Sequence, residues 1–286
     1  MTTALTRLSG SAFELTVTIP WADVKKVYDE VFEEVASETE VEGFRKGKAP
    51  KNLVEEKVDK SKVYGEVINR IVPESYRSAL AEHGLKPILS PQVKITSAEV
   101  EKDWQLIMTS SEKPSVDLGD YKKCVSEINA KGKIWTPDQE VKKEDEESKK
   151  QEEQKKISDI IDKLLEVCKV ELATIMVESE TSRLLTQLLE DVRKAGLTYE
   201  QYLQSSGQTA ESVKEKYTKQ SETALRLEFI LEAIADDLKI VVPEEEINAV
   251  IEKETDLQKK KAIKDQSYLL ASIMRRDKTI SKLLTI

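Results

Sequence analysis

The chain has 286 residues, 54 of them acidic and 45 basic, so its formal net charge is −9. Charged residues make up 35% of the sequence and aromatic residues only 5%, a composition that favours long solvent-exposed helices and argues against a β-rich barrel. Because the chain is acidic, it lacks the net positive field that a general nucleic-acid coat protein needs.

Residues 1–118 combine strands with helices. Apolar and polar residues alternate from Ser11 to Ile19, which predicts a half-buried strand. Apolar residues then recur at helical spacing from Val24 to Val35 and again from Val63 to His83, where Gly84 is suited to end the helix. Two more strands are predicted, one at Val93 and Ile95 and one from Trp104 to Thr109. The pattern predicts an α+β module.

Residues 119–156 are predicted to be a charged linker. From Thr136 to Lys156 the chain carries eight acidic and six basic residues, and its only apolar residue is Val141. Thr136 and Pro137 suit the start of a helix, and acidic residues four positions before basic ones stabilise an exposed helix. The segment has no apolar face to bury, so we expect a solvated helix or a disordered linker that joins two modules.

Residues 157–286 are predicted to be helical throughout, with a weak strand signal only at Ile240–Val242. Apolar residues recur at helical spacing in four segments, 157–168, 184–192, 227–238 and 268–286. No heptad pattern persists for three or four repeats, which argues against a long coiled coil. The predicted fold is therefore an α+β module, a charged linker helix and an all-α domain.

The segment 42–50, Glu-Gly-Phe-Arg-Lys-Gly-Lys-Ala-Pro, is the most unusual in the chain. Gly43 and Gly47 permit sharp turns, and Phe44 is a large apolar side chain beside two cations. Residues 44–62 carry seven basic and three acidic residues. An apolar anchor among cations suits docking to a surface of RNA and protein. The alternative is that Phe44 folds back onto its own module and the bases are merely solvated.

Few residues offer catalytic or metal-binding chemistry. His83 is the single histidine, and Cys124 and Cys168 show neither a CxxC motif nor a metal-ligand spacing. No secretory signal is seen at the N-terminus, and no run of about eighteen apolar residues predicts a membrane helix. We expect a cytoplasmic protein with no catalytic residue, no cofactor and no metal site.

The run Gly43-Phe44-Arg45-Lys46-Gly47-Lys48-x-Pro50 resembles the signature loop of the trigger factor family, bacterial chaperones that associate with ribosomes. Residues 196–203 and 206–209, with the helix up to Leu238, resemble the C-terminal helical domain of the same family. The resemblance implies a ribosome-binding domain over residues 1–118 and a substrate-binding domain over residues 157–286. The ribosome-binding residues that it implies are Gly43, Phe44, Arg45, Lys46, Gly47, Lys48 and Pro50.

The sequence departs from this family in one respect. Typical members carry a prolyl isomerase domain of the FK506-binding type between the two regions, whereas residues 119–156 are too few to fold into such a domain. The interpretation is a chaperone that needs no ATP, that lacks the isomerase and that holds nascent or unfolded polypeptides at the exit of the large ribosomal subunit. No membrane and no free nucleic acid are expected as partners.

Several alternatives stay open at this stage. The chain could be a prolyl isomerase like full-length trigger factors, or a helical scaffold without chaperone activity. Ile175, Met176 and Leu184 are adaptable apolar residues that are predicted to line the substrate-binding surface. The same three residues could instead belong to a closed core.

Overall fold

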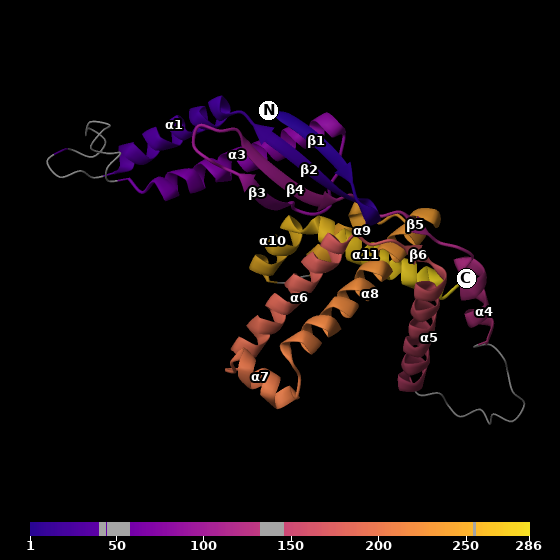
Figure 1. Cartoon of the computed structure of the whole chain (residues 1–286). Helices are drawn as coiled ribbons and strands as arrows, with labels where there is room; N and C mark the ends of the chain where they lie inside the picture. Colours follow the sequence, from indigo (N-terminus) through magenta and orange to yellow (C-terminus); the bar gives the residue numbers. More distant parts are fainter. Residues whose placement is uncertain (40–43, 45–57, 132–145, 254–255) are drawn as a thin grey trace, which may run out of the picture. The chain divides into compact units, whose positions relative to one another are not determined.

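The chain folds into two compact units (Figure 1). The first unit comprises residues 1–113 together with 173–176, and the second comprises 114–172 together with 177–286. The computed structural model describes residues 1–39, 44, 58–131, 146–253 and 256–286. An α+β unit is thus followed by a mostly helical one, which confirms the predicted fold class.

A four-stranded antiparallel sheet forms the base of the first unit. Its strands are β1 (Thr2–Arg7), β2 (Ala12–Ile19), β3 (Gln92–Ser97) and β4 (Trp104–Ser111), in the order β1-β2-β4-β3. In β2, Phe13, Leu15 and Val17 are completely buried, as the alternating pattern predicts. Leu15 lies opposite Met108 of β4 and opposite Leu5 of β1, so one face of the sheet is apolar.

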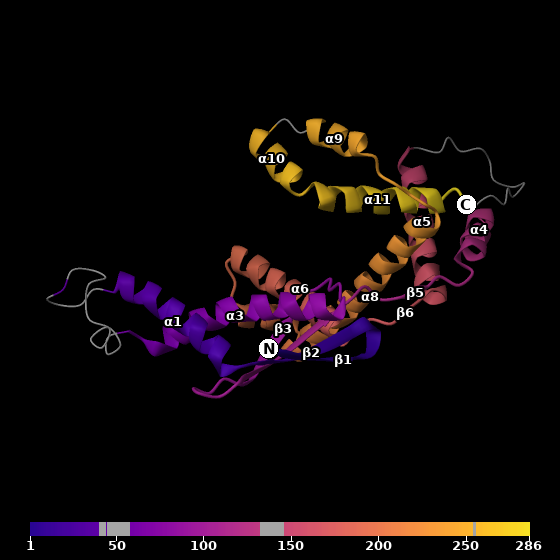
Figure 2. The ribbon, with the colours of Figure 1, turned by 90° about the horizontal axis from the view of Figure 1, so that it is seen from above.

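Two helices, α1 (Trp21–Glu38) and α3 (Lys60–His83), pack against each other and against this apolar face (Figure 2). Aromatic rings connect the helices and the sheet. The centroid of the Tyr64 ring on α3 lies 5.0 Å from that of Tyr28 on α1 and 6.1 Å from that of Trp104 on β4. Gly84 ends α3 with a φ of 64°, a left-handed conformation that glycine adopts without strain.

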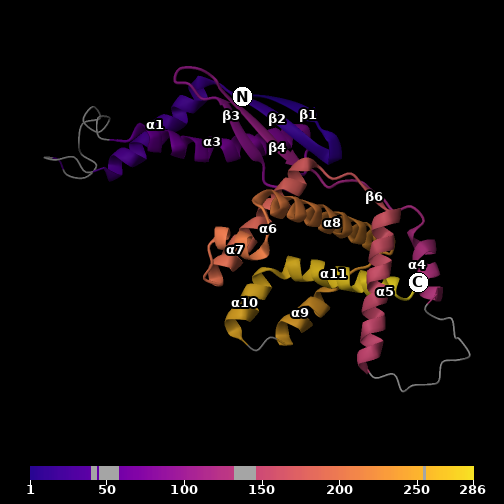
Figure 3. The same ribbon diagram turned by 60° about the horizontal axis from the view of Figure 1, so that its bottom comes forward.

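The second unit is built from helices around one apolar core. Figure 3 shows α4 beside α5 and α8 beside α11, and both pairs are in contact. The elements are β5 (Val116–Asp117), α4 (Tyr121–Lys131), α5 (Glu146–Val167), β6 (Lys169–Val170), α6 (Thr174–Lys194), α7 (Tyr199–Ser206), α8 (Ala210–Asp237), α9 (Glu244–Lys253), α10 (Leu257–Asp265) and α11 (Ser267–Leu283).

Part of the predicted linker belongs to this core. Tyr121 and Val125 of α4 are 4% and 0% exposed, and they pack in one cluster with Leu164 and Ile230. Tyr121 and Val125 stand four residues apart, so both fall on one face of the helix. The structure therefore groups residues 114–172 with the helices, unlike the predicted division into 1–118, 119–156 and 157–286.

The charged helix and the strand signals also differ from expectation. The predicted helix start at Thr136 lies outside the described residues, and α5 runs from Glu146 into the apolar stripe that begins at Ile157. The prediction that residues 157–286 contain no strand except at Ile240–Val242 was wrong. That segment is not a strand, whereas Lys169–Val170 pairs with Val116–Asp117.

Candidate functional site

The segment that the sequence singles out lies between α1 and α3 of the first unit. Phe44 is the only one of the seven predicted ribosome-binding residues within the described part of the chain, and it is 44% exposed. The other six, Gly43, Arg45, Lys46, Gly47, Lys48 and Pro50, lie outside the described residues. A phenylalanine with almost half of its surface in solvent is available for contact with a partner.

Polar contacts fix the end of α1 and the start of α3, which are called the roots of this segment below. The Thr39 hydroxyl donates to the Val35 carbonyl oxygen at 2.7 Å, next to the last turn of α1. At the start of α3 the Asp59 carboxylate accepts a hydrogen bond from the Ser61 N–H at 2.9 Å, which caps the helix. The segment between the two helices therefore begins and ends at well-defined points.

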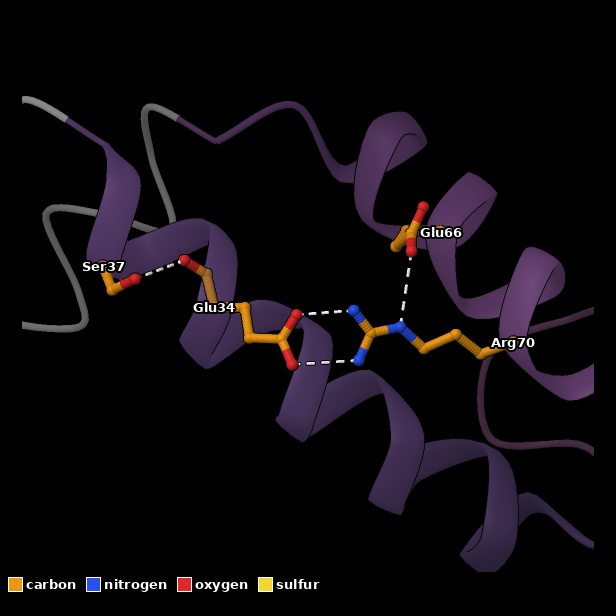
Figure 4. A network of polar contacts seen from close by, with 4 residues as sticks. All are labelled: Glu34, Ser37, Glu66 and Arg70. Carbon is orange, nitrogen blue, oxygen red and sulfur yellow. Dashed lines mark hydrogen bonds and ion pairs between the residues drawn. The ribbon is translucent and has the colours of Figure 1, made fainter.

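An ion-pair network connects α1 to α3 (Figure 4). The Arg70 guanidinium on α3 donates from both Nη atoms to the Glu34 carboxylate on α1, at 3.0 and 2.5 Å. Its Nε lies 3.4 Å from Glu66 Oε1, and the Ser37 hydroxyl donates to the Glu34 carbonyl oxygen at 2.7 Å. A two-point contact of this kind sets the orientation of one helix against the other, although its exposed position limits its effect on stability.

This network predicts how the Glu34 carboxyl titrates. Hydrogen bonds from Arg70 lower the pKa of the Glu34 carboxyl, so the contact is complete at neutral pH and is lost as the pH falls through that lowered pKa. In an Arg70→Met variant, NMR should show the Glu34 pKa rising toward its ordinary value. The pKa of Glu215, which Lys219 lowers on another helix, should stay unchanged. An unchanged Glu34 titration would contradict the network.

The second unit has an open groove of about 440 Å³ between α8, α11 and residues 240–242. Its floor includes Leu231 and Ala235 of α8, which are 3% and 1% exposed. Four of its apolar lining residues, called the rim below, are open to solvent. The rim residues and their exposures are Val241 (73%), Tyr268 (88%), Leu269 (55%) and Ile273 (40%). Exposed apolar residues gathered around a groove are typical of an interaction site.

Arg275 holds this groove in shape. Its Nε donates to the Ile240 carbonyl oxygen at 2.9 Å, and its Nη2 contacts Asp236 Oδ1 at 2.6 Å. On the α8 wall, partial desolvation raises the pKa of the Glu228 carboxyl, and nearby Arg276 opposes this shift. The groove thus combines apolar residues with acidic side chains on α8 and arginines on α11.

The predicted substrate-binding residues do not form one exposed surface. Ile175 and Met176 are 6% and 2% exposed and are grouped with the first unit, whereas Leu184 is half-buried on the part of α6 in the second unit. Sequence reasoning missed the groove residues as a site. A signal was present in α11, where the apolar positions of residues 268–274 extend around about two thirds of the helix, which is wider than one buried face.

The described residues offer little for catalysis. No cluster of three or more His, Cys, Asp or Glu side chains among them could hold a metal ion. Cys168 is buried and donates to the Leu118 carbonyl oxygen, and desolvation raises its pKa to about 11, which leaves the thiol protonated at neutral pH. Across the described residues, no helix combines the length and apolar character needed to span a bilayer.

Comparisons with known proteins agree with this architecture. Residues 1–152 match the family model of the bacterial trigger factor protein, and residues 138–285 match the model of its C-terminus. Trigger factor of Streptococcus agalactiae serotype III (strain NEM316) is 32% identical over 130 residues, which are 46% of this chain and 30% of that protein. Trigger factor of Staphylococcus aureus (strain JH9) is 36% identical over 122 residues, or 43% and 28% of the two chains.

A solved structure has the same fold. It is described by the words "Promiscuous Substrate Recognition in Folding and Assembly Activities of the Trigger Factor Chaperone", and it aligns with a TM-score of 0.68 and 14% identity over 100% of this chain and 99% of that chain. The fold is thus that of a two-part protein, α+β and then helical. The chain belongs to the trigger factor family. The matched regions span less than a third of the length of the two curated relatives.

Proposed function

We propose that this protein is a ribosome-associated molecular chaperone that works without ATP. In this proposal the first unit contacts the large ribosomal subunit near the peptide exit, and the second unit holds nascent or unfolded polypeptides and assists their folding. Its place of action is the cytoplasm. The observation that carries the proposal is the pair of family matches, which follow each other in order and together cover residues 1–285.

The ribosome contact is assigned to the segment between α1 and α3, with Gly43, Phe44, Arg45, Lys46, Gly47, Lys48 and Pro50 as its binding residues. Exposure of Phe44 and the fixed roots at Thr39 and Asp59 support this assignment. A rigid base lowers the entropy that a binding segment loses when it docks.

The polypeptide contact is assigned to the helical unit. The groove beside α11 supports this assignment, because its apolar rim is already exposed and needs no opening to meet a client. Leu184 remains a proposed contact, and Ile175 and Met176 would contact a client only after their buried surroundings open. The solved relative's description names promiscuous substrate recognition, which fits an open apolar surface without a specific pocket.

The proposed activity does not include prolyl isomerisation. The two family matches overlap at residues 138–152, so no unmatched stretch separates the N-terminal region from the C-terminal one. Helix α4 (Tyr121–Lys131), which precedes this overlap, packs into the helical core. Robust turnover of a short proline peptide by the purified chain would overturn this part of the proposal.

Two measurements on the full chain test the function. Purified ribosomes should carry the protein into the pellet on sedimentation, and near-stoichiometric amounts should suppress the aggregation of a chemically unfolded test protein on dilution. Absence of both effects would contradict the proposed function. Suppression of aggregation without ribosome binding would leave a chaperone but remove the ribosome from the proposal.

A further inference from the structure

The two cysteines of the chain lie near one end of the helix pair α4 and α5. Strand β5 leads into α4 and pairs with β6, which follows α5, and this pairing sets Asp117 opposite Lys169. One residue closer to the helices, the Cys168 Sγ donates to the Leu118 carbonyl oxygen at 3.3 Å. The start of α4 and the end of α5 therefore meet in a closely packed junction, and Cys168 is part of it.

Cys124 stands about one turn of α4 beyond this junction. Its backbone N–H donates to the Asp120 carbonyl oxygen at 3.2 Å, the hydrogen bond of one helical turn. The flanking positions Tyr121 and Val125 pack in one apolar cluster with Cys168. One helical turn rises about 5.4 Å, and the Cα atoms joined by a disulfide lie about 4.4–6.8 Å apart. The two cysteines are thus near the separation that a disulfide requires.

Electrostatic effects also place Cys124 beside the end of α5. Burial raises the pKa of the Cys168 thiol to about 11, with smaller contributions from Asp117 and Cys124. On α5, Glu166 raises the pKa of the Lys163 ammonium, and Cys124 adds to this shift. Cys124 therefore faces the last turns of α5, next to Cys168.

The two thiols differ in accessibility. Both are free in this structure, and Cys124 is partly exposed whereas Cys168 is 1% exposed. A small oxidant that arrives from solvent therefore meets Cys124 first. Cys168 is suited to the second step of a thiol–disulfide exchange, in which a neighbouring thiol attacks a sulfur that is already oxidised.

We propose that Cys124 and Cys168 form a reversible intramolecular disulfide with a low-molecular-weight disulfide, such as oxidised glutathione, as the oxidant. The Cys124 thiol loses its proton and attacks one glutathione sulfur, which forms a mixed disulfide and releases one glutathione thiolate. Cys168 then loses its proton and attacks the Cys124 sulfur, and the second glutathione leaves as a thiolate. The two thiolates take up the two protons, so two protein thiols are oxidised and one glutathione disulfide is reduced to two thiols.

The bond ties α4 covalently to the end of α5. It closes the loop of residues 124–168, which lowers the conformational entropy of the unfolded chain and so stabilises the folded helical unit. Disulfides of cytoplasmic proteins are usually transient, so this bond belongs to oxidising conditions. The proposal does not depend on the chaperone function, because it concerns only the chemistry of the two thiols.

Mass spectrometry on the full chain tests the proposal. The purified protein is incubated at low concentration with oxidised glutathione under native conditions, and the remaining thiols are then alkylated. Most of the wild-type chain should lose two hydrogens, accept no alkyl group and give one linked peptide that contains Cys124 and Cys168. The linked form should keep its helical circular dichroism and melt about 5 °C or more above the reduced form. Dithiothreitol should restore the reduced form.

Variants separate the two steps. Cys168→Ala should stop with one glutathione on Cys124, and Cys124→Ser should stay unmodified because Cys168 is buried. A matched control combines Cys168→Ala with Ser205→Cys, which restores two thiols but places the second on α7, away from α4 in Figure 1 and Figure 3. This control should take up two glutathiones and give no linked peptide. Circular dichroism verifies that each variant is folded.

Three contrary results would each overturn the proposal. A wild-type chain that stops at the mixed disulfide means that Cys168 does not reach Cys124 in the folded protein. A covalent dimer means that Cys124 reacts between two chains. A linked form without helical circular dichroism means that the bond formed in unfolded chain and not in the α4–α5 junction.

Discussion

Replacing Phe44, Arg45 and Lys46 together with Ala is expected to weaken ribosome binding by well over tenfold while the melting curve barely moves. Phe44 is 44% exposed, so its loss removes little packing, and exposed substitutions usually change stability by no more than about 0.5 kcal/mol. Truncating a major residue of a binding hot spot costs about 2 kcal/mol or more of binding free energy, and this cluster has an aromatic residue and two cations. Ribosome co-sedimentation and thermal melting on the same variant measure both effects.

A matched control makes a comparable change elsewhere in the first unit. Val100 is 59% exposed, and Lys25 and Lys26 are exposed on α1, so replacing these three with Ala also removes one apolar side chain and two cations. The control should bind ribosomes normally. If the loop variant instead melts earlier and its binding follows folding, Phe44 packs against its own module. If it stays folded and binds as wild type does, the docking proposal is wrong.

Regular elements with a strong pattern were predictable from the sequence. The alternation of Phe13, Leu15 and Val17 identified β2, and Gly84 marked the end of α3, because local backbone preferences and tertiary packing agree there. Strand β1 was not predicted. Its sequence Thr-Thr-Ala-Leu-Thr-Arg has only one large apolar residue, and it pairs with β2 at the edge of the sheet, where little of it is buried.

The candidate site was predictable only in part. The composition of residues 42–50 pointed to the loop, because an apolar residue among cations is unusual in any context. The groove could not be predicted, since the exposure of Leu269 and Ile273 depends on how far α8 and residues 240–242 approach α11. The burial of Ile175 and Met176 likewise depends on tertiary packing, which periodicity along one helix does not reveal.

The burial of α4 also could not be predicted from the sequence, and it leads to a second prediction with a large expected effect on stability. Residues 119–156 read as a charged linker, because the dense charges after Thr136 mask the two core positions Tyr121 and Val125. In the structure the Tyr121 ring is 4% exposed, and its hydroxyl donates to Asp237 Oδ2 at 2.5 Å. Lys122 also contacts Asp237, at 2.8 Å. These contacts connect α4 to the end of α8 inside the second unit.

Tyr121→Ala should therefore lower the free energy of unfolding of the second unit by about 3–5 kcal/mol, the usual cost of removing a buried aromatic ring. Tyr121→Phe keeps the ring and loses one hydrogen bond, so about 1 kcal/mol is expected. Tyr268→Ala, at a tyrosine that is 88% exposed in the same unit, should stay within about 0.5 kcal/mol of wild type.

Two probes assign the loss to one unit. In a Trp135→Phe background the remaining tryptophans, Trp21 and Trp104, both lie in the first unit, so tryptophan fluorescence follows its unfolding in denaturant. Circular dichroism follows the helices, most of which belong to the second unit. Tyr121→Ala should shift the helical transition and leave the fluorescence transition in place. An unshifted helical transition would mean that α4 is a dispensable linker after all, because removal of a ring from a packed core cannot leave the stability of that core unchanged.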